Sequence, residues 1–223
     1  MDERARKISE TMRAKGLDNF KEWRNEQKRL GNIKSEYPSL EQGGDLAELI
    51  GVVLGDGHIE AFPRTERLLI FSNANNPGFV DRYANMVEKL FNKKPYVYKT
   101  KGKECIRIGI YEKQISSRLG VPTGARKELE LPVPPWILSN KEYIVRYLRG
   151  LYEAEGSLSF HPPTYTHKFA FSNLNQSLLG NVHDLMSSLG FHPSKGSKVV
   201  QISRKAEVAE AVELIQFRKY SAQ

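Results

Sequence analysis

Hydrophobic and polar residues follow two kinds of spacing along this chain, and the same order of spacings occurs twice. Apolar residues three and four positions apart indicate helices, whereas alternating apolar and polar residues indicate strands. In the first half, Asp45 and Glu48 suit a capping box at the start of a helix that is predicted to end near Gly57. Strands are predicted at residues 58–62, 67–72, 96–100 and 105–111, with helices at 79–91 and from about Lys113.

The second half repeats this succession. Ser139 or Asn140 is predicted to cap a helix that runs to Ala154. Strands are predicted at 157–161, 169–173 and 198–203, with helices at 177–189 and 206–217. In both halves a helix ends in an acidic residue and a glycine, and short extended segments and a second helix follow.

An internal repeat explains why the pattern occurs twice. Residues 49–59, LIGVVLGDGHI, align with residues 148–158, LRGLYEAEGSL, at an offset of 99. The alignment places Asp56 opposite Glu155. Further ordered matches follow, among them the tripeptide Phe-Ser-Asn at 71–73 and at 171–173. Two copies in the same order indicate a duplication, and two are too few for a solenoid.

The repeat divides the chain into segments. We expect a first repeat at 45–120, a second at 140–218 and a short tail at 219–223. Residues 121–139 between the repeats hold four prolines, which predict a stiff, extended connector rather than a helix. Residues 1–44 lie outside the repeat and are expected to form a polar helical extension, broken at Gly16 and Gly31.

Composition narrows the functional classes. The chain has 223 residues and a net charge of +8, which favours a polyanionic partner. It lacks an apolar run long enough for a membrane span and lacks a secretory signal, and its single cysteine, Cys105, excludes an intramolecular disulfide and a cysteine-cluster zinc site. An intracellular location is therefore expected, in the cytoplasm or nucleoid, or in an organelle of a eukaryote. The five histidines show no metal-ligand spacing.

Small residues and acids together predict a site. Gly51 and Gly55, and likewise Gly150 and Ala154, lie four positions apart, on one face of each predicted helix. Glycine inside a helix costs about 1 kcal/mol relative to alanine, so close packing of the two helices is a reason to keep it. Asp56 and Glu155 then lie at helix C-termini, where carboxylates are unfavourable and where the next glycine allows a left-handed turn. A bound divalent cation would relieve the repulsion between the two acids.

One Asp-Gly after a helix is usually only a turn. An acid followed by glycine at matching positions after two helices favours a chemical role for the two acids. Glu153 has Leu54 as its counterpart, so we interpret it as a structural or solvent-facing acid.

The two motifs, LIGVVLGDG at 49–57 and LRGLYEAEG at 148–156, resemble those of single-chain, two-motif LAGLIDADG homing endonucleases, and so does the segment LPVPPWIL before the second motif. The resemblance covers about residues 45 to 215. It implies an α+β fold of two pseudo-symmetric αββαββα repeats, with the motif helices at the interface and two curved antiparallel sheets as a saddle over DNA. It also implies a monomer that cuts both strands of a long, asymmetric duplex site, with Mg²⁺, or another divalent cation such as Mn²⁺, bound by Asp56 and Glu155. Leu54 departs from the family's pattern, where an acid is common.

Basic residues are the remaining candidates. Lys113 and Lys205, at the strand-to-helix junctions, are symmetric candidates for offsetting charge in the transition state, with Arg204 as an alternative in the second copy. The residues expected to contact DNA phosphates and bases are Arg64, Arg67, Lys99, Lys101, Lys103, Arg107, His161, His167, Lys168, Lys195 and Lys198. The aromatic residues Tyr96, Tyr98, Phe169 and Phe171 are expected in the core rather than as stacking platforms.

Two other functions use the same fold. One is a DNA-binding regulator that does not cut, although a regulator would have no need to keep two acids together. The other is an RNA-splicing cofactor (a maturase) that binds intron RNA. A self-splicing intein is not expected, because the chain begins with Met1-Asp2 and ends in Ser-Ala-Gln, without a nucleophile at the start or His-Asn at the end.

Overall fold

The computed structural model describes residues 3–16, 18, 20–31, 34 and 36–220. It divides into two compact units, Met1–Pro38 and Ser39–Gln223. The first unit consists of two polar helices, α1 (Glu3–Ala14) and α2 (Lys21–Arg29), which Gly16 and Gly31 follow in left-handed conformations. No helix of the described residues is both long and apolar enough to cross a bilayer.

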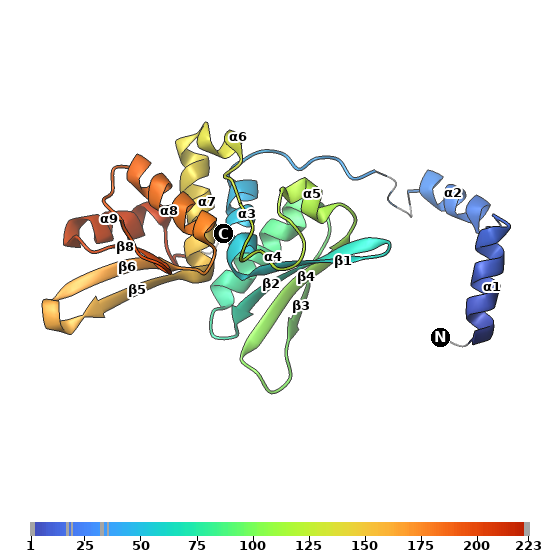
Figure 1. Ribbon diagram of the computed structural model, residues 1–223, viewed down its shortest axis with the longest axis horizontal. Coiled ribbons are helices and arrows are strands. Elements are labelled where there is room, and N and C mark those ends of the chain that lie inside the picture. Colours follow the sequence, from blue (N-terminus) through green and yellow to red (C-terminus); the bar gives the residue numbers. More distant parts are fainter. Residues whose placement is uncertain (1–2, 17, 19, 32–33, 35, 221–223) are drawn as a thin grey trace. The chain divides into compact units, whose positions relative to one another are not determined.

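The second unit contains both repeats and has the predicted α+β architecture (Figure 1). The first repeat comprises α3 (Gly44–Asp56), β1 (Gly57–Phe62), β2 (Thr65–Asn73), α4 (Pro77–Phe91), β3 (Tyr96–Lys99), β4 (Cys105–Glu112) and α5 (Ile115–Leu119). The second comprises α7 (Lys141–Glu155), β5 (Gly156–His161), the 3-10 turn η1 (Pro162–Thr164), β6 (Thr166–Ser172), α8 (Gln176–Ser188), β7 (Ser194–Lys195), β8 (Val199–Ile202) and α9 (Lys205–Ile215). The order αββαββα therefore occurs twice.

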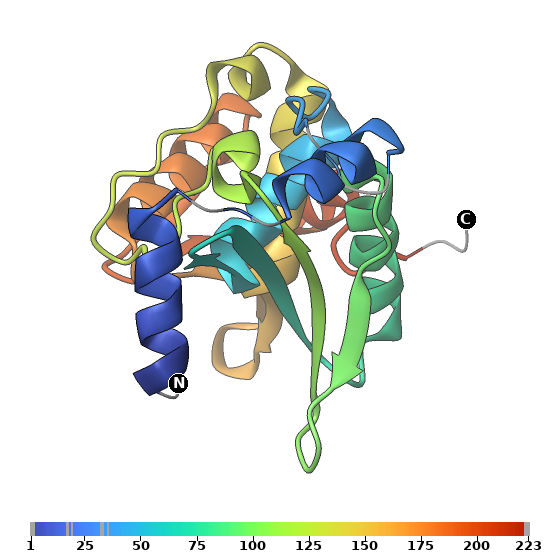
Figure 2. The same cartoon turned by 90° about the vertical axis from the view of Figure 1, so that its right-hand side faces the viewer.

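Each repeat builds one antiparallel sheet. Within the described residues, the strand orders are β1-β2-β4-β3 and β5-β6-β8-β7. Side chains of a strand alternate between its two faces, so Ile59, Ile70 and Ile108 point to the helices and are fully buried. The other face of each sheet, which we call the open face, carries none of the helices described in this unit (Figures 1 and 2). Figures 1 and 2 show the helices of this unit gathered on one side of the two sheets.

The two motif helices, α3 and α7, pack directly on each other at the centre of the unit (Figure 1). A Cβ added to Gly51 would lie 2.3 Å from the Tyr147 carbonyl oxygen, and one added to Gly150 would lie 2.1 Å from the Glu48 carbonyl oxygen. No larger side chain fits between backbones this close. The four small residues singled out in the sequence, Ala154 included, thus lie in this contact.

The ends of the motif helices differ from the prediction in two ways. The N-cap of α3 is Gly43 and makes no side-chain cap hydrogen bond, so the predicted capping box at Asp45 and Glu48 is wrong. Gly57 and Gly156 are extended, with φ of −93° and −84°, instead of left-handed. Their lack of a side chain serves another purpose, because a Cβ on Gly57 would lie 2.5 Å from the Val53 Cα as the strand turns back on the helix.

The connector between the repeats is not extended throughout. It holds a short helix, α6 (Pro135–Leu138), contrary to the prediction. Pro135 is the first residue of that helix, where the fixed φ of proline suits a helix and the missing N–H loses no hydrogen bond. The prolines at 132 and 134 precede it, so the extended part ends where α6 begins.

Candidate functional site

Two acidic side chains converge where the motif helices end. Asp56 is the last residue of α3, Glu155 is the last residue of α7, and both are partly buried. A Cβ on Gly55 would lie 2.4 Å from the Ala154 Cβ and 3.2 Å from the Glu155 Cγ, so the two helix ends touch. The small residue before each acid is what allows this approach.

The local environment disfavours charge on both acids. Burial, and then the charge of Glu155, raise the pKa of Asp56 to about 7, and burial raises the pKa of Glu155. Both carboxylates also face the negative end of a helix dipole. Among the described residues, neither acid has an ion-pair or hydrogen-bond partner. The pair therefore carries negative charge that this part of the chain leaves uncompensated.

A divalent cation fits such a pair. Hard cations such as Mg²⁺ are often held by only one or two protein carboxylates, with water and substrate phosphates completing the coordination. The described residues contain no group of three or more His, Cys, Asp or Glu that could enclose an ion on their own. The donor set thus matches a site that shares its cation with a phosphate, and differs from a closed structural metal site.

The lysines paired by the repeat do not join the acids. Gly57 pairs with Ile70, and Ile70 with Ile108, so Lys113 lies five residues further along, about 16 Å in the strand direction. The register of the second sheet separates Lys205 from Gly156 in the same way. Both lysines are exposed, and Arg204 pairs with Glu207 at 2.9 Å. The repeat relates the lysines to each other, but the sheet register keeps them away from the acids.

The predicted DNA-contacting residues lie in different places. Arg67, Arg107 and Lys168 lie on the open faces, whereas Arg64, Lys101, Lys103 and Lys198 lie in exposed loops at strand ends. Because side chains alternate along a strand, three others lie on the helix-covered faces: Lys99, His167 and Lys195. Lys99 pairs with Glu104 at 3.1 Å, and the His167 ring lies 5.0 Å from that of Phe160. His161 ends β5, but its side chain lies outside the described part of the chain.

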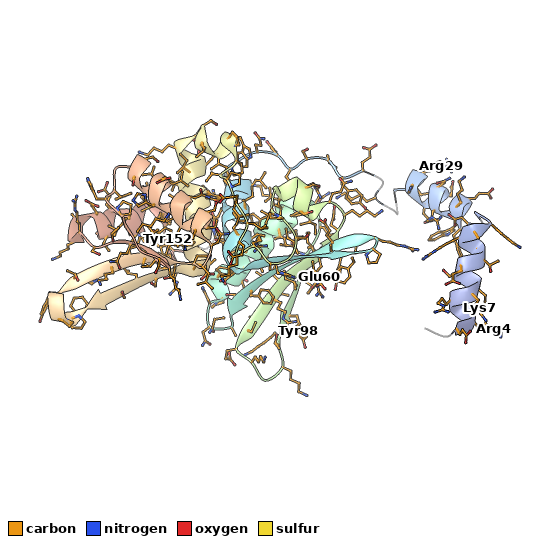
Figure 3. The ribbon with its side chains drawn as sticks, viewed as in Figure 1. Arg4, Lys7, Arg29, Glu60, Tyr98 and Tyr152 are labelled. Atoms are coloured by element: carbon orange, nitrogen blue, oxygen red, sulfur yellow. The ribbon has the colours of Figure 1, made fainter. Side chains whose placement is uncertain are left out.

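The open face of the first sheet is aromatic. Tyr96, Tyr98 and Tyr111 are 38%, 52% and 43% exposed, so the prediction that the first two belong to the core is wrong. The Arg67 guanidinium lies 5.6 Å from the centre of the Tyr111 ring, donates to the Tyr111 hydroxyl at 3.0 Å and is ion-paired with Glu60. Tyr98 lies on β3 and Glu60 on β1 (Figure 3). Phe169 and Phe171 are fully buried, as predicted.

The open face of the second sheet differs. It carries mainly small and hydroxyl side chains, with one lysine: Ser157, Ser159, Lys168, Ala170, Ser172 and Gln201. The large aromatic groups of this repeat point the other way, and Tyr152 stacks on Phe169 with ring centres 4.3 Å apart between α7 and the sheet (Figure 3). The two halves therefore share a backbone plan but present different chemistry.

Glu153, interpreted as structural or solvent-facing because its counterpart is Leu54, is buried and structural. It accepts hydrogen bonds from the Tyr220 hydroxyl and, at 2.6 Å, from the Arg218 backbone N–H. Sequence reasoning missed Arg126, whose guanidinium donates to the carbonyl oxygens of Val53 and Gly57 on either side of Asp56. Arg126 belongs to the connector and has no counterpart in the repeat, so comparing the two halves could not reveal it.

Sequence comparison gives limited information. No family model matches the chain. A segment of 144 residues is 29% identical to a DNA polymerase of Methanocaldococcus jannaschii, covering 57% of this chain but only 8% of that protein. The match spans so little of the polymerase that it carries no polymerase activity over to this chain.

Comparison of structures identifies the fold. A mesophilic variant of the homing endonuclease I-DmoI superposes with a TM-score of 0.54 at 19% identity, over 77% of this chain and 94% of that one. I-DmoI in complex with DNA and Mn gives 0.52 at 18% identity, over 81% and 98%. The N-terminal LAGLIDADG domain of DUF199/WhiA gives 0.52 at 15% identity, over 81% and 83%. The chain thus has the two-motif LAGLIDADG fold, and at these identities the likeness establishes the fold alone.

Proposed function

We propose that this protein is an endonuclease that uses a divalent cation, Mg²⁺ or Mn²⁺, to cut both strands of a long, asymmetric duplex DNA site. One observation carries the proposal: Asp56 and Glu155 converge at touching helix ends, and neither carboxylate has an ion-pair partner among the described residues. Keeping two partly buried, repelling carboxylates destabilises a fold, so their presence is best explained by a cation and a phosphate that complete the site.

The side chains have distinct tasks in this reaction. A divalent cation, when bound, neutralises phosphate charge and supports in-line displacement at phosphorus. Asp56 and Glu155 would hold it, and the contact of Gly55 with Ala154 fixes the separation of the two helix ends. Without a cation, the Asp56 carboxyl carries a proton about half of the time near pH 7, because its pKa is about 7. The Asp56 carboxyl would therefore have to release that proton in order to act as a cation ligand.

The difference between the two open faces supports an asymmetric site. A palindromic duplex presents the same surface to both halves of a pseudo-symmetric protein, whereas here one half offers arginine with exposed tyrosines and the other offers serines with one lysine. Each face would contact a different half-site. The net charge of +8 supports a polyanionic partner. Complexes of I-DmoI with its target DNA support duplex DNA as the substrate class.

The test is selection of cut sites from a randomised duplex library in the presence of Mg²⁺. The unmodified protein should yield double-strand breaks within one sequence, and Asp56→Asn or Glu155→Gln should yield none. Asp81→Asn, on the exposed surface of α4, serves as a matched control that should cut normally. Sequence-specific binding by unmodified protein that never cuts any duplex would refute the nuclease and favour a DNA-binding regulator.

A second candidate function is an RNA-splicing cofactor, and the aromatic open face favours it. Exposed tyrosines on a sheet suit stacking of unpaired bases, which occur in structured RNA and are absent from an intact duplex. Binding that is tighter to a structured intron RNA than to any selected duplex, and that Tyr98→Ala weakens, would favour this function.

A further inference from the structure

The connector crosses the junction where α3 ends and β1 begins. Gly124 donates its backbone N–H to the Ile59 carbonyl at 3.0 Å. Two residues later, the Nη2 of Arg126 donates to the carbonyl oxygens of Val53 at 2.8 Å and Gly57 at 2.6 Å. Val53 lies in the last turn of α3 and Gly57 is the first residue of β1. One guanidinium nitrogen therefore bridges the backbone on both sides of Asp56.

The charge of Arg126 has an unusual setting. Its Nη1 is buried without a hydrogen-bond partner, and no carboxylate of the described residues pairs with it. Burial lowers the pKa of Arg126, but an arginine keeps its charge at any physiological pH. The free carbonyls at the C-terminus of a helix carry partial negative charge and stabilise a cation there. The end of α3 is thus the principal counter-charge of this guanidinium.

The other end of the connector is fastened to the second repeat. The buried Asn175, which caps α8, donates its Nδ2 to the carbonyl oxygens of Arg126 at 2.6 Å and Leu129 at 2.8 Å. The backbone N–H of Leu131 donates to the Ser177 Oγ at 2.9 Å. The backbone around Arg126 is consequently held by α8, and the side chain is aimed at α3 from a fixed base.

The second repeat has no such bridge. The repeat alignment places Tyr152 and Gly156 opposite Val53 and Gly57. Across the described residues, no side chain donates to either carbonyl, and the end of α7 has only the backbone bond from Gly156 N–H to the Tyr152 oxygen. The bridge therefore acts on one acid of the pair.

We infer that Arg126 is a positioning residue that fixes the Asp56 carboxylate relative to Glu155 by bridging the α3–β1 junction. The inference rests on the proposed function as far as the reaction is concerned. In that reaction the pseudo-two-fold of the repeats would also relate the two antiparallel DNA strands, and a bridge on the Asp56 side alone would act more on the strand nearer Asp56. Loss of the bridge should loosen the cation site and slow the two cuts unequally.

The variants are Arg126→Met, which removes the donors, and Arg126→Lys, which keeps the charge with a shorter reach. Lys127→Met is the matched control, because Lys127 is exposed and its ion pair among the described residues is with its neighbour Glu128 at 3.2 Å. Three quantities are measured for each protein: amide hydrogen exchange across residues 50–60, affinity for Tb³⁺ by luminescence, and the ratio of nicked to linear product from a plasmid carrying the selected site.

In Arg126→Met, exchange should rise at the Gly57 amide, which bonds to the Val53 oxygen, while α8 stays protected. Tb³⁺ affinity should fall about tenfold, as when a residue that supports metal ligands is removed, and nicked plasmid should accumulate. Arg126→Lys should recover part of each effect, and Lys127→Met should match the unmodified protein.

Unchanged exchange at 50–60 and unchanged Tb³⁺ affinity in Arg126→Met would overturn the inference, whatever the cutting assay gives. So would a rise in exchange spread evenly over the second unit, because that is the signature of a purely structural residue. Increased local exchange in a protein whose unmodified form neither binds Tb³⁺ nor cuts DNA would refute the proposed function and leave the bridging role standing.

Discussion

Replacement of Asp56 by asparagine should stabilise the protein at neutral and alkaline pH while abolishing cation binding and cutting. Burial and the charge of Glu155 raise the pKa of Asp56 from 3.8 to about 7. A shift of about 3 units corresponds to about 4 kcal/mol of destabilisation by the ionised form. Asparagine removes the charge but keeps polar atoms that also lose water on burial. We therefore expect a net gain of roughly 1–3 kcal/mol in the free energy of unfolding above pH 7.

The pH dependence separates this effect from a packing effect. With a raised pKa, the folded state keeps the Asp56 proton at pH values where the unfolded state has lost it. The stabilisation is complete below about pH 4, where the carboxyl is protonated in both states. It is lost as the pH rises through about 7. The difference between Asp56→Asn and the unmodified protein should grow over this window and remain constant above it.

Urea unfolding at several pH values between about 5 and 8, without divalent cations, measures this difference. Asp81→Asn again provides the control for removing one carboxylate from an exposed position and should show no such window. A variant no more stable than the unmodified protein at pH 8, or a difference that does not change with pH, would refute the reasoning. Either result would mean that the ionised Asp56 is already compensated in the folded protein.

Three further outcomes are expected. The affinity of the unmodified protein for Tb³⁺ should rise roughly tenfold per pH unit below pH 7 and level off above it, because the cation competes with the Asp56 proton. Titrations followed by luminescence at several pH values measure this affinity, and an affinity that does not change with pH would contradict the prediction. Gly150→Ala should destabilise the fold by about 3 kcal/mol or more in urea unfolding, because its Cβ would lie 2.1 Å from the Glu48 carbonyl oxygen. The control is Gly180→Ala on α8, whose Cβ would meet the end of a lysine side chain at 3.5 Å. This variant should be neutral or stabilising by up to about 1 kcal/mol. Glu48→Gln should cost about 3–5 kcal/mol, because it leaves the half-buried Arg82 without a carboxylate partner and removes one of the two carboxylates that pair with Arg146, against little change for the exposed Glu210→Gln; equal unfolding midpoints would show that the ion pairs add nothing.

The order of helices and strands was predictable from the sequence because it occurs twice, whereas the arrangement of the two sheets followed from the resemblance to the LAGLIDADG family. Because the sequence is duplicated, each helix and strand could be predicted from two segments. Short segments whose pattern is ambiguous, such as β1 and β5, could therefore be assigned together. The small residues at 51, 55, 150 and 154 also predicted the helix contact, because only close backbones explain glycine inside a helix. The acids at the ends of those helices followed from the same alignment.

The parts that sequence could not supply depend on register and on the connector. Lys113 and Lys205 match each other in the alignment, but their separation from the acids depends on which residues pair across the sheets. The exposure of Tyr96 and Tyr98 depends on which face of β3 the helices leave open. Arg126 lies outside both copies, where the repeat gives no guidance, and only the folded chain brings it to Val53 and Gly57.

The motif helices combine attraction at one end with repulsion at the other. Near the start of α3, the buried Glu48 accepts from Arg82 at 2.5 Å and from Arg146 of α7 at 2.5 Å, which ties the two repeats together. Eight residues later, about 12 Å along the helix, Asp56 meets Glu155, and the part of the chain that the structure describes offers neither acid an ion-pair partner. The glycine contact in the middle fixes the position of one helix relative to the other, because backbones this close cannot slide past each other without steric overlap. The ion pairs at Glu48 and the bridge of Arg126 thus offset a repulsion between the two acids that a bound cation would remove.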